Sequence, residues 1–138
     1  MSRHYYDEQC LVLWRKCVRA LWQDKCAICS ITKEQCGFIG DRQILECHHG
    51  IPRSNWKFRH EPVNGILLCP LKHDWAETHP VEFEAFLREH WSATYDFIIA
   101  NRFTTLDSPL WDIHLMERRT KLKETLEWLK EITAHPSP

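Results

Sequence analysis

The chain has 138 residues, enough for one domain with a modest core, and its 43% hydrophobic and 27% charged residues are ordinary for a globular protein. A net charge of −1 excludes a protein that binds its partners through overall positive charge. The first residues lack the apolar segment of a signal peptide, and no apolar run approaches the roughly 18 residues that a membrane-spanning helix needs. We therefore expect a cytoplasmic protein in a reducing compartment.

Cysteine is the most informative residue type in the composition. The chain has seven cysteines, an odd number that excludes a complete set of internal disulfides. In a reducing compartment cysteines are usually free thiols or metal ligands. The composition therefore points to a bound metal.

The N-terminal segment 7–23 is predicted to form an amphipathic helix. Its apolar residues recur every three or four positions: Leu11, Trp14, Val18, Leu21 and Trp22. Cys10 and Cys17 fall within the helix, where we expect them to act as small apolar core residues.

Residues 26–79 have a different character, with short apolar runs separated by turn and loop signals. Segment 43–49 reads as a strand, 52–64 as a polar loop, and 65–69 as a second short strand or the start of a helix.

Helical periodicity returns near Pro80, which suits a first helical position. One helix is expected from Pro80 to about Trp91 and another over 93–103. Ser108 and Pro109 resemble an N-cap followed by proline, which predicts a long helix from there to about Thr133. The predicted class is α+β, a single domain over 1–138, with an N-terminal helix (7–23), a metal-rich β unit (26–79) and a helical extension (80–133).

Two short motifs carry ligand types at metal-binding spacing. Cys26-Ala-Ile-Cys29 is a CxxC pair, whose two thiolates suit one tetrahedral Zn²⁺. Leu68-Cys69-Pro70-Leu71-Lys72-His73 adds another thiol and an imidazole downstream.

Residues 26–77 combine these motifs in a specific order. The CxxC pair is followed by His48-His49 and Ile-Pro-Arg-Ser, then by Asn64 before an apolar run, then by Cys69 and His73. This order, over a little more than a third of the chain, resembles the HNH (ββα-metal) endonuclease family, in its small free-standing phage or bacterial form. The resemblance implies a ββα-metal core with a zinc knuckle. It also implies a DNA partner in a phage-infected or bacterial cytoplasm, and phosphodiester hydrolysis that leaves 5′-phosphate and 3′-hydroxyl ends.

The resemblance assigns the two adjacent histidines different roles. It makes His48 a ligand of a divalent ion (Mg²⁺, Mn²⁺, Ni²⁺ or Zn²⁺) and His49 the general base that activates water, and imidazole suits both tasks. His73 becomes the second ligand, and Asn64 holds the loop that orients the base. Glu77 lies one helical turn after His73, so we expect it to be a further ligand of the same ion.

Lys72 departs from the family pattern, which has cysteine at that position, because lysine cannot take its place as a zinc ligand. The predicted structural zinc site is Cys26, Cys29, Cys36 and Cys69. Cys47 or a histidine is an alternative fourth ligand, and a chain that has lost its zinc is another alternative.

Residues 47–60 contain Arg53, Lys57 and Arg59 and no acidic residue, with two aromatic residues between these basic ones. This composition suits contact with a phosphate backbone, so Arg53, Lys57 and Arg59 are predicted to bind nucleic acid. An ordinary solvated loop is the alternative.

Two other functions are compatible with these motifs. One is a non-catalytic zinc-binding module that contacts nucleic acid or another protein, and the other is a degenerate HNH fold retained for binding. A nuclease with one site per chain that cuts both strands often works as a dimer, so a homodimer is also expected.

Overall fold

The computed structural model describes residues 3–29 and 45–134. In chain order the elements are α1 (Arg3–Leu21), β1 (Glu46–His49), a 3-10 turn η1 (Pro62–Asn64), β2 (Gly65–Leu68), α2 (Pro70–Thr78), α3 (Pro80–His90), α4 (Ser92–Asn101) and α5 (Asp112–Ala134). The predicted α+β class is confirmed. In these two ranges, no helix is both long enough and apolar enough to cross a membrane.

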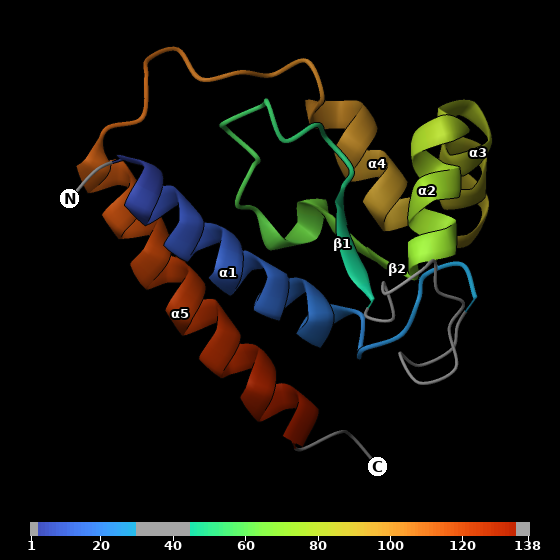
Figure 1. The fold of residues 1–138 in the computed structure, drawn as a ribbon, viewed down its shortest axis with the longest axis horizontal. Helices are drawn as coiled ribbons and strands as arrows, with labels where there is room; N and C mark the ends of the chain where they lie inside the picture. Colours follow the sequence, from blue (N-terminus) through green and yellow to red (C-terminus); the bar gives the residue numbers. More distant parts are fainter. Residues whose placement is uncertain (1–2, 30–44, 135–138) are drawn as a thin grey trace.

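Strands β1 and β2 form an antiparallel hairpin at the centre of the molecule (Figure 1). Cys47 lies opposite Leu67, and His49 lies opposite Gly65. All four residues of β2 are buried, because α1 packs on the hairpin from one side and α2 from the other. The hairpin therefore joins two groups of helices, α1 with α5 and α2 with α3 and α4.

The close fit of α1 on the hairpin depends on Gly65. A Cβ atom at this position would lie 2.1 Å from Val18 Cγ2 and 3.1 Å from Trp14 Cζ2. Both side chains are about 1% exposed or less, so they occupy the space that a larger residue would need. Trp22 adds a hydrogen bond from its indole N–H to the Gly65 carbonyl, at 2.9 Å.

Helix α1 begins at Arg3, four residues earlier than predicted, and ends at Leu21. The early start was missed because the first buried position along the helix is Asp7, a charged residue that does not fit the apolar pattern. The helix stops before Gln23 and Asp24, which both have a φ of 54°, outside the right-handed helical region.

Asp7 anchors the loop between the two strands. Its carboxylate accepts two hydrogen bonds from Arg59, both 2.9 Å long, and one of 2.7 Å from His60 Nε2. Arg118 of α5 donates to His60 Nδ1 at 3.0 Å and to the Trp56 carbonyl at 2.7 Å. Both α1 and α5 therefore hold residues 56–60 in place.

Helix α5 packs along α1 on the side away from the hairpin (Figure 1). The Cys10 and Cys17 thiols are buried there and donate to the carbonyls of Leu115 (3.3 Å) and Leu122 (3.7 Å). These two cysteines are core residues, as the sequence predicted.

The predicted start of the last helix at Ser108 and Pro109 is wrong. Helix α5 begins at Asp112, and the Trp111 backbone N–H donates to His114 Nδ1 at 3.0 Å. His114, at the third helical position, thus accepts a hydrogen bond from the backbone N–H of the residue just before the helix, as in a capping box. Leu110, two residues before the helix, is buried.

The predicted starts of the central helices agree well with the structure. Pro80 occupies the first helical position of α3, as predicted, and α4 covers most of the predicted 93–103 segment. Trp91, between α3 and α4, donates its indole N–H to the Ala27 carbonyl at 3.0 Å. This bond ties the α2–α4 group to the segment that carries Cys26 and Cys29.

Candidate active site and cysteine cluster

Three predicted ligands of the divalent ion come together between β1 and α2. His48, His73 and Glu77 each offer one ligand atom, and these atoms all lie within 4.8 Å of one another. The rings of His48 and His73 meet edge to face with centroids 5.2 Å apart, and Phe83 of α3 packs against His48 from another direction. Two imidazoles and one carboxylate can hold a divalent metal ion.

Glu46 orients His73 and was not singled out from the sequence. Its Oε1 lies 2.9 Å from His73 Nδ1, while His73 Nε2 lies 3.1 Å from Glu77 Oε1. A carboxylate on Nδ1 fixes the ring and leaves Nε2 for an ion, as in many metal sites. Glu46 could have been found from its position two residues before His48, because alternate residues of a strand share a face.

His49 lies on the opposite face of β1, against α1. Its ring stacks on Trp14 with centroids 4.0 Å apart and planes inclined by 12°. Its Nε2 lies 3.0 Å from the Arg59 carbonyl oxygen, which can only accept, so Nε2 carries the hydrogen. The other nitrogen, Nδ1, is then the accepting one in the neutral ring.

Both histidines are neutral near pH 7. Burial, followed by the charges of His73 and His49, lowers the pKa of His48 to about 4. Burial also lowers the pKa of His49 to about 4, and the charges of Arg53, Arg59 and Arg15 act in the same direction. Each ring therefore has a lone pair available for a metal ion or a proton.

Although they point to different faces of the strand, His48 and His49 line one cavity of about 260 Å³ at the end of β1. Glu77 and Glu84 contribute the carboxylates of its lining. The apolar part of the lining comes from Pro52, Ala76, Pro80, Phe83, Leu87 and Ile98. The candidate metal ligands and the candidate base therefore face a shared space.

Asn64 is fully buried below this cavity and holds the loop that follows β1. Its side-chain oxygen accepts the Ile51 N–H at 2.6 Å, and its amide donates to the carbonyls of Ile51 (3.0 Å) and Phe58 (3.2 Å). Its own carbonyl accepts the Gly50 N–H at 2.9 Å. Asn64 therefore holds the 50–61 loop in place. Because this loop includes the Arg59 carbonyl that bonds His49, Asn64 also helps to position the His49 ring.

The three predicted nucleic-acid contacts have different environments. Arg53 and Lys57 are exposed, and Arg53 forms a long ion pair of 3.9 Å with Glu8. The Arg59 side chain is 12% exposed and its guanidinium is bonded to Asp7. These contacts favour a structural role for Arg59 and leave Arg53 and Lys57 accessible to a ligand.

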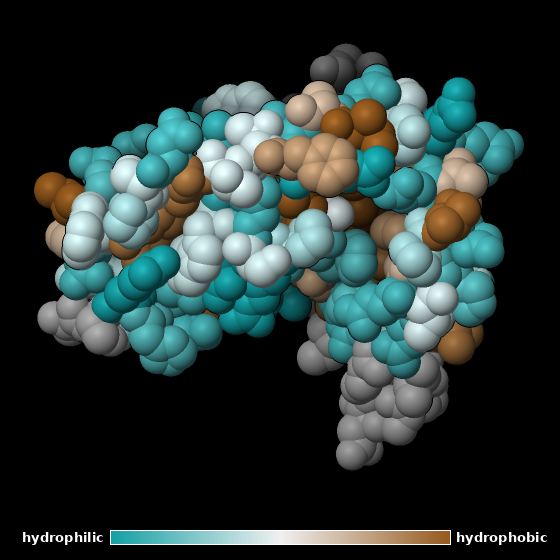
Figure 2. Space-filling view, turned by 90° about the horizontal axis from the view of Figure 1, so that it is seen from above, coloured by the Kyte–Doolittle hydropathy of each residue, from teal (hydrophilic) through white to brown (hydrophobic). Residues whose placement is uncertain are grey.

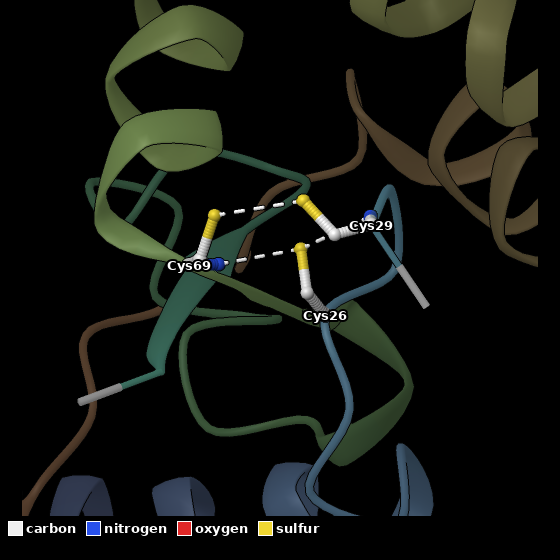
Figure 3. A group of neighbouring side chains, drawn as sticks. All are labelled: Cys26, Cys29 and Cys69. Carbon is white, nitrogen blue, oxygen red and sulfur yellow. Dashed lines mark hydrogen bonds between the residues drawn. The ribbon is translucent and has the colours of Figure 1, made fainter. Parts of the chain in front are cut away.

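A second group of candidate ligands joins the segment after α1 to the start of α2 (Figure 3). The sulfur atoms of Cys26, Cys29 and Cys69 point toward one another, each within 4.8 Å of the others, and those of Cys29 and Cys69 are 3.8 Å apart. Three thiols at this separation could hold one metal ion. The predicted fourth ligand, Cys36, lies outside the described residues.

Cys47, an alternative fourth ligand, and Lys72, which stands where the family has cysteine, both have other contacts. The Cys47 thiol donates to the Arg15 carbonyl at 3.7 Å, on the α1 side of the hairpin, and burial raises its pKa to about 11. The Lys72 ammonium lies 5.9 Å from the centre of the Trp75 ring. Cys47 is therefore a packing residue, and Lys72 is directed at an aromatic side chain.

Backbone N–H groups favour the thiolate form of Cys26. Burial alone would raise its pKa, but N–H groups of Cys29 and Cys69, each 3.4 Å from the sulfur, and of Ile28 bring it below the usual value. Burial and the neighbouring Cys26 raise the pKa of Cys29 to about 12. A metal ion that binds all three sulfurs must displace protons, so its affinity depends on pH.

No protein-family model, no curated protein and no solved structure matches this chain.

Proposed function

We propose that the protein is a metal-dependent endonuclease of the HNH (ββα-metal) type that hydrolyses phosphodiester bonds in DNA. The observation that carries this proposal is the division of the histidine pair. His48 groups with His73 and Glu77, while His49 is held separately by Trp14 and the Arg59 carbonyl, and both line the same cavity. The hairpin followed directly by α2 agrees with a ββα arrangement.

The residues of the first group fit a divalent cation. His48, His73 and Glu77 would hold it, and Glu46 would orient His73. Nitrogen and carboxylate ligands accept Mg²⁺, Mn²⁺, Ni²⁺ or Zn²⁺, with higher affinity for the last two. When bound, such an ion stabilises negative charge on the phosphate and on the departing 3′ oxygen.

His49 would take the proton from the attacking water. Its Nδ1 is the accepting nitrogen, because Nε2–H donates to the Arg59 carbonyl, and the Trp14 stack restricts rotation of the ring. A pKa of about 4 makes it a weak base in the free protein. The negative charge of a bound phosphodiester favours the protonated ring and therefore raises this pKa toward neutrality.

The three clustered cysteines would hold a structural zinc, with Cys36 as the predicted fourth ligand. Such a zinc would fix the Cys26–Cys29 segment to the start of α2, the helix that carries His73. A structural metal contributes directly to folding free energy, so the cysteine cluster would support the site without taking part in the chemistry.

Plasmid nicking tests the proposal. With Mg²⁺, Mn²⁺ or Ni²⁺ the protein should nick supercoiled DNA, EDTA should stop the reaction, and His49→Ala should abolish it while DNA binding is retained. His90→Ala is the matched control, because His90 is half-exposed on α3 and should be dispensable. Cleavage by His49→Ala at the parental rate would refute the assigned base.

A second candidate function is a zinc module, or a degenerate nuclease fold, that only binds. The cysteine cluster on its own favours it, because that group needs no catalytic partner. Metal analysis separates the two functions. One tightly held zinc, with no second exchangeable ion and no cleavage of supercoiled, linear, single-stranded or branched DNA, would favour the binding module.

A further inference from the structure

The C-terminal half of α1 carries positive charge without acidic partners. After Glu8 the helix contains Arg15, Lys16 and Arg19 and no acidic residue. Arg15 and Arg19 are half-buried and one helical turn apart. Among the described residues, no carboxylate forms an ion pair with either guanidinium.

These two arginines lie on the side of α1 that faces away from α5. With 3.6 residues per turn, Arg15 and Arg19 project roughly opposite to Cys10 and Cys17, whose thiols contact α5. They flank the row that begins at Trp14 and packs on the hairpin. They are therefore placed beside the hairpin, on a side that α5 does not cover.

Contacts to β1 show which strand they lie beside. The Cys47 thiol donates to the Arg15 carbonyl, and Trp14, the preceding residue, stacks on His49. The ion pair between Arg53 and Glu8 places Arg53 beside the N-terminal half of α1, and Arg19 lies one helical turn beyond Arg15. The three arginines thus follow β1 in the order Arg53, Arg15, Arg19.

The edge of β1 that faces away from β2 has no strand partner within the described residues. The surface seen from above is mainly hydrophilic, and it is indented between the lobe that carries α1 and α5 and the lobe that carries α2–α4 (Figure 2). The cavity lined by His48 and His49 is at the end of the same strand. An elongated anion lying along β1 would meet both the arginines and the cavity.

We propose that Arg15 and Arg19, continuing the row from Arg53, bind the phosphate backbone of duplex DNA along β1 and lead it to the cavity that contains His48 and His49. This inference rests on the proposed function, for which it identifies the substrate-binding surface. A protein with a net charge of −1 cannot attract DNA through its overall charge, so a local row of cations is needed. Arginine suits this role because its planar guanidinium can bond two phosphate oxygens.

Binding without hydrolysis tests the inference separately from the reaction. Fluorescence anisotropy with a labelled 20-base-pair duplex and no added divalent ion, over a series of salt concentrations, gives the Kd and its salt dependence. Each neutralised phosphate contact contributes about 0.9 to the slope of log K against log salt. Arg15→Gln/Arg19→Gln should therefore weaken binding at least tenfold and reduce the slope by about 2, whereas Arg15→Lys/Arg19→Lys should keep most of the slope.

Lys123→Gln/Lys130→Gln is the matched control, because it removes two charges from exposed positions on α5 and should change neither quantity. Far-UV circular dichroism should show that each double variant is folded. An unchanged Kd and slope for the arginine-to-glutamine variant, or no duplex binding by the wild type, would overturn the inference. So would equal losses for the glutamine and lysine variants, since these would indicate a structural role, and so would preferential binding of polyglutamate, since it would indicate an acidic protein partner.

The two proposals can fail separately. A protein that binds duplex DNA through Arg15 and Arg19 but never cuts it refutes the nuclease and retains this surface. A protein that cuts DNA with an unchanged salt slope in the arginine-to-glutamine variant refutes the surface and retains the nuclease.

Discussion

Replacing Asn64 with alanine should strongly destabilise the protein, because the Asn64 side chain satisfies backbone hydrogen-bonding groups of a loop that has no regular secondary structure to do so. It is 0% exposed and makes three hydrogen bonds to the backbone of the loop between the strands. Asn64→Ala would leave the Ile51 N–H and the carbonyls of Ile51 and Phe58 without these partners. All three groups belong to residues that are at most 9% exposed.

The magnitude follows from the cost of unsatisfied groups. A buried donor or acceptor that loses its partner costs about 1–3 kcal/mol, and an N–H is less tolerant than a carbonyl. The Ile51 N–H, bonded at 2.6 Å, should account for the largest share. We expect Asn64→Ala to lower the free energy of unfolding by about 3 kcal/mol.

Urea denaturation at equal zinc content measures this loss, with Asn55→Ala as the matched control. Asn55 lies in the same loop and also makes two side-chain hydrogen bonds, to the Thr104 carbonyl and the Lys57 N–H, but both are exposed. Water can replace them, so Asn55→Ala should cost less than about 1 kcal/mol. Equal losses for the two variants, or a loss below about 1 kcal/mol for Asn64→Ala, would refute the reasoning.

Three further predictions concern other parts of the molecule. Burial lowers the pKa of His60 from 6.5 to about 4, so between these pH values the unfolded chain binds more protons than the folded one. The free energy of unfolding should therefore fall by about 3 kcal/mol as the pH drops from 6.5 to 4. Urea midpoints measured across this interval should fall less in His60→Gln than in the wild type, and equal falls would contradict the assignment. Cys69→Ser should lose bound zinc by elemental analysis whereas Cys47→Ser should keep it, and full zinc occupancy in Cys69→Ser would exclude the cluster as the metal site. Gly65→Ala should cost about 1–3 kcal/mol in thermal or urea unfolding because its Cβ would overlap Val18, and a wild-type stability would show that α1 can shift without cost.

Local chemistry explains where the sequence predicted the fold well. Pro80 marked a helix start correctly, since the fixed φ of proline suits the first helical turn. The start of α1 was missed because Asp7 is buried through bonds to Arg59 and His60, more than fifty residues away. From the pattern of apolar residues alone, a charged residue such as Asp7 is expected to face solvent.

The same distinction applies to the candidate site. The resemblance to the HNH family pointed to His48 and His73, and the spacing of one helical turn added Glu77; the fold gathers the ligand atoms of all three. Trp14 and the Arg59 carbonyl were not predicted as supports of His49. They reach it through the packing of α1 and the path of the 50–61 loop, which depend on contacts between distant segments.

The pairing of α1 with α5 has a consequence for the order in which the molecule can assemble. The thiols of Cys10 and Cys17 bond to carbonyls 105 residues further along the chain. Contacts between residues so far apart in sequence form late and slow folding, because closing the large loop between them costs conformational entropy before the contacts can form. Helix α1 also supplies Trp14, so the support for His49 comes from an element whose opposite face stays uncovered until α5 has been synthesised.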